Sequence, residues 1–330
     1  MKYVVVKMLT AAMLCLTNTL TVYAQFNSLF LTNPPVTLQV LGEGFISTAM
    51  NERDFALSAD GKEIYFTIST PQSSFQTIVY SKQISDTKWT TPEIVSFAGK
   101  YSDLEPSFSS DGQTLYFASN RPLAGNTVKD FDIWKVHRTA TGWGEPINMG
   151  SPINTPSDEF YPSIARNGNL YYTATYKEGP GREDIYVSVF KDKVYQKPVA
   201  LDTTVNSKFY EFNAFVDPDE HYILFTSYGR KDEKGGGDLY MSLKNKHGNW
   251  QRAQPLAALN SKQLDYCPYV SPDGKSLFIT SNRHVLPISF TEKRASYLAI
   301  QEAWSLPLNG SGNIFWIDFQ KIRDDVKLTP

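Results

Sequence analysis

One short pattern recurs five times along this chain of 330 residues: an apolar strand, a tight turn, and a second strand rich in Leu, Tyr and Phe. Unit one spans Phe55–Phe66 around Asp60-Gly61, and unit five spans Ser271–Ile279 around Asp273-Gly274. Asp-Gly between alternating strands predicts a hairpin, because its turn needs a positive φ that glycine adopts freely. The second turn residues, spaced by 51, 56, 52 and 54 residues, are Gly61, Gly112, Gly168, Glu220 and Gly274. The chain is therefore predicted to be an array of similar β units.

Each unit continues beyond its hairpin. The predicted third strands are Thr77–Ser81, Asp132–Val136, Asp184–Ser188, Asp238–Ser242 and Asn313–Asp318. The predicted fourth strands, which contain Pro and mostly follow a Trp, are Pro92–Phe97, Pro146–Met149, Pro198–Leu201 and Pro255–Ala258. Unit five lacks a fourth strand at the C-terminal end, and we expect Pro35–Leu41 to supply it and close the ring. These units predict an all-β, five-bladed β-propeller of four-stranded antiparallel blades, with six blades as the alternative.

The repeat also carries a family resemblance. Residues 271–283 (Ser-Pro-Asp-Gly-Lys-Ser-Leu-Phe-Ile-Thr-Ser-Asn-Arg) resemble the WD-repeat-like propeller repeat of the TolB type, as do 104–134 and 143–148. The resemblance extends over nearly the whole chain after residue 24. It implies an extracytoplasmic propeller that binds proteins or other components of the bacterial cell envelope.

The N-terminal residues predict export. Residues 1–24 have Lys2 and Lys7 followed by a short apolar run, which is typical of a signal peptide cleaved between Ala24 and Gln25. Leu14 precedes Cys15, so we expect no lipid anchor and a periplasmic or secreted protein. We expect residues 25–34 to be a linker, 35–320 the propeller and 321–330 a C-terminal tail.

The composition of the chain limits the classes of partner and cofactor that we expect. A formal net charge of −2 gives no argument for a nucleic-acid binder, and no later apolar run is long enough for membrane insertion. Cys267 is the only cysteine expected in the mature chain, which excludes an internal disulfide and a cysteine metal site. We expect a monomer without a resident cofactor.

A carboxylate precedes or begins the first strand of every unit. Because successive strands of a blade run in opposite directions, two sets of loops lie on the same face of the propeller. These are the loops that precede the first strands and the loops between the second and third strands, and their face is called here the loop face. The Asp-Gly turns lie on the opposite turn face. The candidate residues for a ligand site at the channel mouth on the loop face are Glu52, Asp103, Glu159, Glu211 and Asp265. In unit four, Tyr210 is an alternative to Glu211 at the equivalent position. Arg121 and Arg283 are the candidate basic partners. Such carboxylates either bind Ca²⁺ or a polar ligand, or they are structural and cap turns or pair with an arginine of a neighbouring blade. In the structural case Arg121 and Arg283 are expected to form ion pairs between blades or to donate to turns.

Unit five contains an insertion. Its second and third strands are separated by residues 284–312, whereas units two to four have nine or ten residues there. Thr291 is predicted to cap a helix over Glu292–Trp304 with Tyr297, Ile300 and Trp304 on one face. This helix is either a partner-docking element beside the channel mouth or a helix packed on the rim.

The sequence has no catalytic signature such as Gly-x-Ser-x-Gly or His-Glu-x-x-His. We therefore predict a non-catalytic binding or scaffold module for a protein or glycan partner at the cell envelope. The alternative is a secreted, glycoside hydrolase-like enzyme that uses two of the channel-mouth carboxylates as acid and base or nucleophile.

Overall fold

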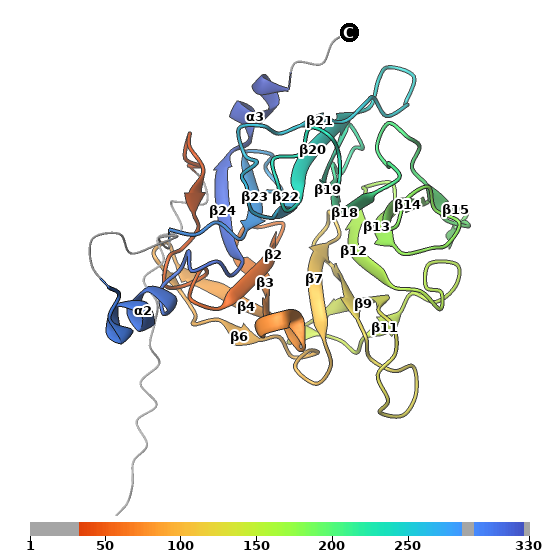
Figure 1. Cartoon of the computed structure of the whole chain (residues 1–330). Helices are drawn as coiled ribbons and strands as arrows, with labels where there is room; N and C mark the ends of the chain where they lie inside the picture. Colours follow the sequence, from red (N-terminus) through yellow and green to blue (C-terminus); the bar gives the residue numbers. More distant parts are fainter. Residues whose placement is uncertain (1–32, 286–293, 327–330) are drawn as a thin grey trace, which may run out of the picture.

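The computed structural model describes residues 33–285 and 294–326, which form five antiparallel blades around a central axis (Figure 1). The expected signal peptide lies outside the described residues. The innermost strands are β2 (Asn51–Leu57), β7 (Asp103–Phe108), β12 (Glu159–Ile164), β18 (Tyr210–Val216) and β22 (Asp265–Val270). The second strands are β3 (Glu63–Ser69), β8 (Thr114–Ser119), β13 (Leu170–Ala174), β19 (Tyr222–Tyr228) and β23 (Ser276–Ser281). The third strands are β4 (Gln76–Ser85), β9 (Asp132–Thr139), β14 (Asp184–Ser188), β20 (Asp238–Leu243) and β24 (Asn313–Asp318).

The outermost strands are short. Those of blades one to four are β6 (Glu93–Ile94), β11 (Ile147–Asn148), β17 (Val199–Ala200) and β21 (Gln254–Pro255). Small additions at the blade edges are the 3₁₀ turn η1 (Pro71–Ser73) and the strands β5 (Lys88–Trp89), β10 (Gly142–Trp143), β15 (Phe190–Lys191) and β16 (Val194–Tyr195). The five-bladed prediction is confirmed.

The N-terminal segment completes blade five, as predicted. Strand β1 (Gln39–Val40) pairs antiparallel with β24, with Gln39 opposite Trp316. The Leu41 N–H donates to the Ile314 carbonyl at 2.8 Å, and the Asp318 N–H donates to the Pro35 carbonyl at 2.8 Å. The ring is thus closed by residues from both ends of the described chain, and β24 has no free edge along this pairing.

The turns between first and second strands share a backbone hydrogen bond from the residue at the glycine position to the carbonyl three residues earlier, and blades one, two and five add a bond from a serine hydroxyl to the turn aspartate. The Ser58 hydroxyl donates to the Asp60 carboxylate at 2.6 Å, and Gly61 has a φ of 71°. In blade four Glu220 occupies the glycine position with a φ of 57°. Its carboxylate accepts a hydrogen bond from the Tyr171 hydroxyl of blade three at 2.6 Å. An inter-blade contact therefore accompanies the one turn among the five in which glycine is replaced.

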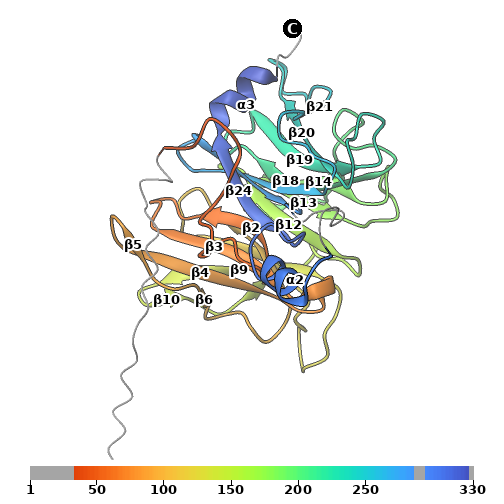
Figure 2. The same cartoon turned by 60° about the vertical axis from the view of Figure 1, so that its left-hand side comes forward.

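Two helices flank β24. Helix α2 (Tyr297–Trp304) belongs to the insertion before this strand, and α3 (Phe319–Asp325) follows it, so the two lie at opposite ends of β24 (Figure 2). Phe319 and Ile322 of α3 are buried in the core shared by blades four and five. The segment expected to be a tail from residue 321 therefore begins inside a packed helix. No helix in the described part of the chain is long and apolar enough to span a bilayer.

Candidate functional site

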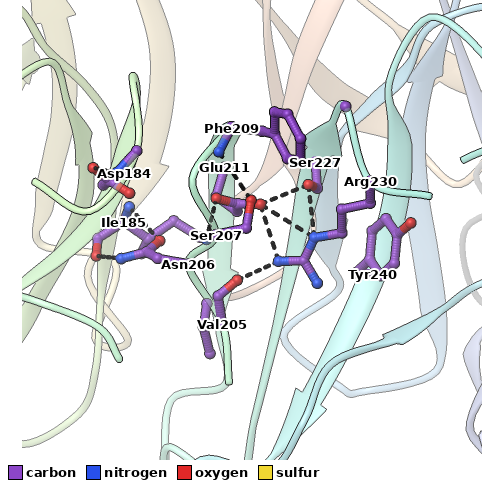
Figure 3. Close-up of polar contacts among 12 residues, drawn as sticks. Asp184, Ile185, Val205, Asn206, Ser207, Phe209, Glu211, Ser227, Arg230 and Tyr240 are labelled. Carbon is purple, nitrogen blue, oxygen red and sulfur yellow. Dashed lines mark hydrogen bonds and ion pairs between the residues drawn. The ribbon is translucent and has the colours of Figure 1, made fainter. Parts of the chain in front are cut away.

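The five repeated carboxylates are buried. Glu52 is 1% exposed, and Asp103, Glu159, Glu211 and Asp265 are 0% exposed. Each is held by donors from the loop that precedes its strand or from its own or a neighbouring blade. Figure 3 shows blade four, where the Glu211 carboxylate accepts hydrogen bonds from the Ser207 backbone N–H at 2.6 Å and the Ser227 hydroxyl at 2.7 Å. The Arg230 guanidinium adds bonds at 3.0 and 3.1 Å and reaches the Val205 carbonyl.

Blades two and five repeat this arrangement. Arg121 binds Asp103 at 2.5 Å and the Phe97 carbonyl at 3.0 Å. Arg283 binds Asp265 at 3.0 Å and also reaches the Leu259 carbonyl. The structure therefore pairs each predicted arginine with the carboxylate of its own blade, and the expected pairing between blades is wrong for Arg121 and Arg283, because each arginine follows the second strand that lies beside its own carboxylate-bearing first strand. The sequence analysis missed Arg230. In blades two and five one residue separates the serine from the arginine, whereas in blade four two residues separate Ser227 from Arg230.

Blades one and three use threonine instead of arginine. The Glu159 carboxylate accepts from the Thr155 hydroxyl at 2.7 Å and from its N–H at 3.2 Å. Glu52 accepts from the Thr48 N–H at 3.1 Å and from the Asn313 amide at 3.0 Å. These contacts fix loops to strands, which is the structural role weighed in the sequence analysis. Tyr210 differs from the carboxylates, because its hydroxyl accepts from the exposed Arg182 at 3.1 Å on the loop face.

A second repeated position lies two residues further along each innermost strand. All five strands carry a β-bulge there. The first bulge residue has a φ between 50° and 62° in every blade; these residues are Asp54, Glu105, Tyr161, Asn213 and Cys267. Left-handed backbone is costly for residues with a side chain. Because the left-handed conformation recurs in all five blades, we infer that the fold imposes it. The bulge directs one side chain of each blade towards the axis.

The bulge side chains form a closed network, called here the axial polar ring, which also includes Arg53. The Arg53 guanidinium donates to Asp54 at 2.8 Å and to Glu105 at 2.8 Å. Glu105 also accepts from the Asn213 amide at 3.2 Å, and the Cys267 thiol donates to Asp54 at 2.7 Å. Blades one, two, four and five are therefore tied together at the axis by side chains far apart in sequence.

Blade three joins the ring through its backbone. The bulge N–H groups of Glu105 and Asn213 each donate to a threonine hydroxyl of the preceding blade, Thr67 and Thr173, at 3.1 Å. Ala118 occupies the equivalent place in blade two and has no hydroxyl. The Tyr161 N–H donates instead to the Glu105 carboxylate at 2.7 Å. Glu105 thus replaces a missing threonine, and the ring includes all five blades.

Burial dominates the electrostatics along the axis. It raises the pKa of Glu105 to about 8, with Arg53 opposing the shift and Asp54 adding to it. It raises the pKa of Glu183, which precedes β14 on the loop face, to about 7, again with Arg53 opposing. The carboxylates of Asp54 and Glu105 outweigh burial at Arg53, so the pKa of this guanidinium lies well above its usual value. The axis therefore combines the Arg53 cation with the Glu105 carboxyl group, whose pKa is raised to about 8, and Glu183 is a second carboxyl group with a raised pKa on the loop face.

These shifts predict how stability depends on pH. Burial also raises the pKa of Glu159 to about 7 and of Asp238 to about 6. A carboxyl group with a raised folded-state pKa holds its proton in the folded chain over a range where the unfolded chain has lost it. The contribution of such a group to the stability of the folded state is therefore complete below about pH 4.5. This contribution is lost as the pH rises through the folded-state pKa. We expect the thermal midpoint to fall by at least about 5 °C between pH 5.5 and pH 8.5.

The measurement is thermal unfolding followed by circular dichroism across this range. The variant Glu105→Gln should show a shallower fall, because one of the titrating groups is removed. Glu93→Gln, at an exposed position on β6, serves as the matched control and should follow the parent protein. A midpoint that rises with pH over this range would contradict the prediction.

The structure also bears on the expected cation. Among the described residues, one group of side chains offers ligand atoms within 4.8 Å of one another: Asp217, Asp219 and His221. It lies at the turn between β18 and β19, on the turn face, and includes none of the predicted carboxylates. Asp219 is paired with Arg166, and Asp217 lies 3.0 Å from His221. Calcium binding at the channel mouth stays a prediction, and thermal unfolding with millimolar Ca²⁺ tests it.

The insertion forms a shorter helix than expected. Helix α2 begins after Ser296, whose hydroxyl accepts a hydrogen bond from the Ala299 N–H at 3.1 Å. The expected cap Thr291 and the first expected helical residues lie outside the described residues. At the end of the insertion, the Asn309 amide donates to the Ala49 carbonyl at 3.0 Å, which ties the insertion to the loop before β2. Ile300 is partly buried, but Tyr297 and Trp304 are 78% and 64% exposed.

Comparison with known proteins supports the fold. No family model matches this chain, and no curated protein sequence is similar to it. A solved glycoside hydrolase has a TM-score of 0.52 at 8% identity, with 88% of this chain and 93% of the hydrolase covered. A solved complex of BT0996 with RGII also has a TM-score of 0.52 at 8% identity, with 86% and 92% covered. TolB from Acinetobacter baumannii has a TM-score of 0.45 at 11% identity, and the match spans 55% of its length. The first two likenesses support a β-propeller, and membership of the WD-repeat-like TolB type stays a prediction.

Proposed function

We propose that this protein is a non-catalytic binding module of the bacterial cell envelope and that α2 is its docking element for a protein partner. The observation that carries the proposal is the exposure of large apolar side chains on and just after this helix. Tyr297, Leu298, Trp304 and Leu306 are 78%, 73%, 64% and 53% exposed. A group of large exposed apolar side chains on one short segment costs solubility unless a partner covers it. Trp and Tyr are also the residues that most often anchor protein interfaces.

The charged groups support binding rather than catalysis. The repeated carboxylates are buried and hydrogen-bonded within or between their blades, and Glu105 is bonded through both oxygens in the axial polar ring. A catalytic acid or base needs an oxygen that can reach the substrate. The expected signal peptide and the resemblance to TolB-type repeats support the envelope location. Of the two partner classes expected from sequence, a protein is favoured over a glycan, because an apolar, aromatic helix face matches a hydrophobic protein surface.

The experiment uses the mature chain from Gln25 as an immobilised bait for solubilised envelope proteins, followed by titration with the purified partner. The double variant Tyr297→Ser/Trp304→Ser should bind at least about 30-fold more weakly, because the loss of even one anchoring aromatic residue costs about 2 kcal/mol. Val199→Ser, which removes a 64% exposed side chain from β17, is the matched control and should bind as the parent does. Equal binding by the double variant, or saturable binding of a purified envelope glycan alone, would overturn the proposal.

A hydrolase remains the second candidate, and Glu183 is the observation that favours it. This half-buried residue lies where β14 begins on the loop face, and its pKa of about 7 suits a general acid. Burial and neighbouring charges set this pKa, and no hydrogen bond from the described residues lowers it. Glycan turnover that is abolished in Glu183→Gln would replace the binding proposal by this one. Glu178→Gln, a change at an exposed carboxylate of the same loop, is the control.

A further inference from the structure

A pocket opens on the axis at the turn face, on the opposite side of the propeller from the loops that carry α2. Its volume is about 270 Å³, and all five blades contribute to its wall. Towards the interior it leads to a space of about 10 Å³ beside Glu105 and Tyr161, which holds roughly one water molecule. Glu105 and Tyr161 of the axial polar ring thus lie at the inner end of the pocket.

The wall of the pocket is divided into an aromatic side and a hydroxyl side. At one equivalent position of the innermost strands, blades two and three carry Ser107 and Ser163, and blades four and five carry Phe215 and Tyr269. Each serine lies opposite a tyrosine of the second strand, whereas Phe215 lies opposite Leu224. The Phe215 and Tyr269 rings meet edge to face with centroids 5.5 Å apart. Both are only partly buried, so they offer ring surface to a ligand.

The rim of the pocket is acidic. Its lining includes the carboxylates of Asp217, Asp219 and Asp273 and one guanidinium, that of Arg166. Arg166 neutralises Asp219, and the exposed Lys275 lies 3.6 Å from Asp273. Asp217 faces His221, and Glu105 adds a carboxyl group at the inner end of the pocket. Aromatic faces and carboxylates together attract a cation more strongly than either alone.

We propose that this turn-face pocket binds an organic cation, a primary ammonium or guanidinium group on an aliphatic stem. The source is either a free amine or the side chain of a Lys or Arg residue in a peptide. The stem lies against Phe215 and Tyr269, and the charged group reaches the carboxylates of the rim. The volume suits one such side chain and is smaller than the usual pocket for a drug-sized ligand. The proposal is independent of α2 and of the partner proposed above.

The test measures binding of butylguanidinium to the mature chain by ligand-observed NMR, with its uncharged counterpart butylurea as the comparison. Butylguanidinium should bind in the millimolar range or more tightly, and butylurea should bind at least about 10-fold more weakly. A second arm compares free butylguanidinium with an arginine-containing pentapeptide. Tighter binding of the peptide assigns the site to a peptide side chain, and tighter binding of the free cation assigns it to a small amine. Failure of both ligands to bind would overturn the proposal.

The five similar turns provide matched variants. Asp273 and Asp111 occupy equivalent turn positions, and each accepts a serine hydroxyl hydrogen bond at 2.6 Å, but only Asp273 lines the pocket. Asp273→Asn should weaken butylguanidinium binding at least about 5-fold, whereas Asp111→Asn should leave it unchanged. Ser107→Leu, which places a larger side chain in the pocket, should abolish binding. Trp304→Ser should bind butylguanidinium normally, which separates this site from the docking function of α2. Equal weakening by Asp273→Asn and Asp111→Asn, or equal affinity for butylurea, would overturn the proposal.

Discussion

Removal of residues 25–42 is expected to abolish the monomeric fold. The deletion takes away β1, so the backbone edge of β24 loses its partner and the last blade loses its outermost strand. It also removes Leu41, which is fully buried in the core between blades five and one. Loss of one such leucine costs about 2–5 kcal/mol, which is a large part of the stability of a typical domain. Size-exclusion chromatography and thermal unfolding should show an aggregated or unfolded chain instead of a cooperative monomer.

The control for this experiment is a shorter deletion of residues 25–32, which leaves β1 and the Pro35 carbonyl in place. We expect it to remain monomeric with an unchanged thermal midpoint. The exposed edge of β24 should also recruit strands from other copies of the chain. A synthetic peptide of residues 33–42 added in excess should therefore raise the midpoint of the longer deletion. A monomeric 25–42 deletion with the parent midpoint would show that ring closure does not depend on β1.

Replacing Arg53 by Met is expected to destabilise the protein by about 3–5 kcal/mol, which is the usual cost of removing one partner of a buried ion pair. Arg53 supplies the cation of the axial polar ring, and its side chain is 15% exposed. Without it, no cation among the described residues lies at hydrogen-bond distance from the buried carboxyl groups of Asp54 and Glu105. Asp54 already has one buried carboxylate oxygen without a hydrogen-bond partner among the described residues. Urea unfolding at pH 9, above the Glu105 pKa of about 8, gives the free energy with this carboxyl group mostly ionised.

Two comparisons make this prediction specific to the ring. Arg182→Met removes a loop-face arginine whose guanidinium binds only the Tyr210 hydroxyl among the described residues, and it should leave the unfolding midpoint unchanged. The triple variant Arg53→Met/Asp54→Asn/Glu105→Gln removes the charges together and should recover part of the lost stability. The single variant should also be least destabilised at acid pH, where Glu105 is protonated. A loss below about 1 kcal/mol for Arg53→Met would show that the ring contributes little to stability.

The repeating features of the fold could be predicted because they depend on short-range chemistry. Gly61 and Gly274 mark turns whose positive φ restricts the residue type, and the alternating strands around them define the faces of each sheet. The same repetition indicated Asp103, Asp265, Arg121 and Arg283 as candidates, but it did not show that each arginine pairs with the carboxylate of its own blade. Repetition also explains their role. A group that serves every blade in the same way stabilises the blade, and the distinctive features of this protein lie at positions where the blades differ.

Those differing positions could not be assigned from sequence. Asp54, Glu105, Tyr161, Asn213 and Cys267 are five different residue types, so no motif connects them. They meet only because a bulge turns each one towards the axis, and a bulge has no glycine here to mark it. The turn-face pocket depends in the same way on Ser107 and Phe215 occupying one equivalent position in different blades. The sequence did contain one signal for these positions. Each lies two residues after a repeated carboxylate, and the residue type at this position differs from unit to unit.

The sequence by itself determined the number of blades, their strand order and the source of the closing strand, because hairpin geometry and the spacing of about fifty residues leave few other arrangements. The tertiary structure decided what the charged groups do. The surroundings of a carboxylate depend on residues brought close by ring closure, such as Arg53 and Glu105, which are 52 positions apart. Burial and neighbouring charges together then set the pKa values of these groups. The same closure leaves α2 exposed on the loop side and opens the axial pocket on the turn side, and the two proposed binding sites follow from these placements.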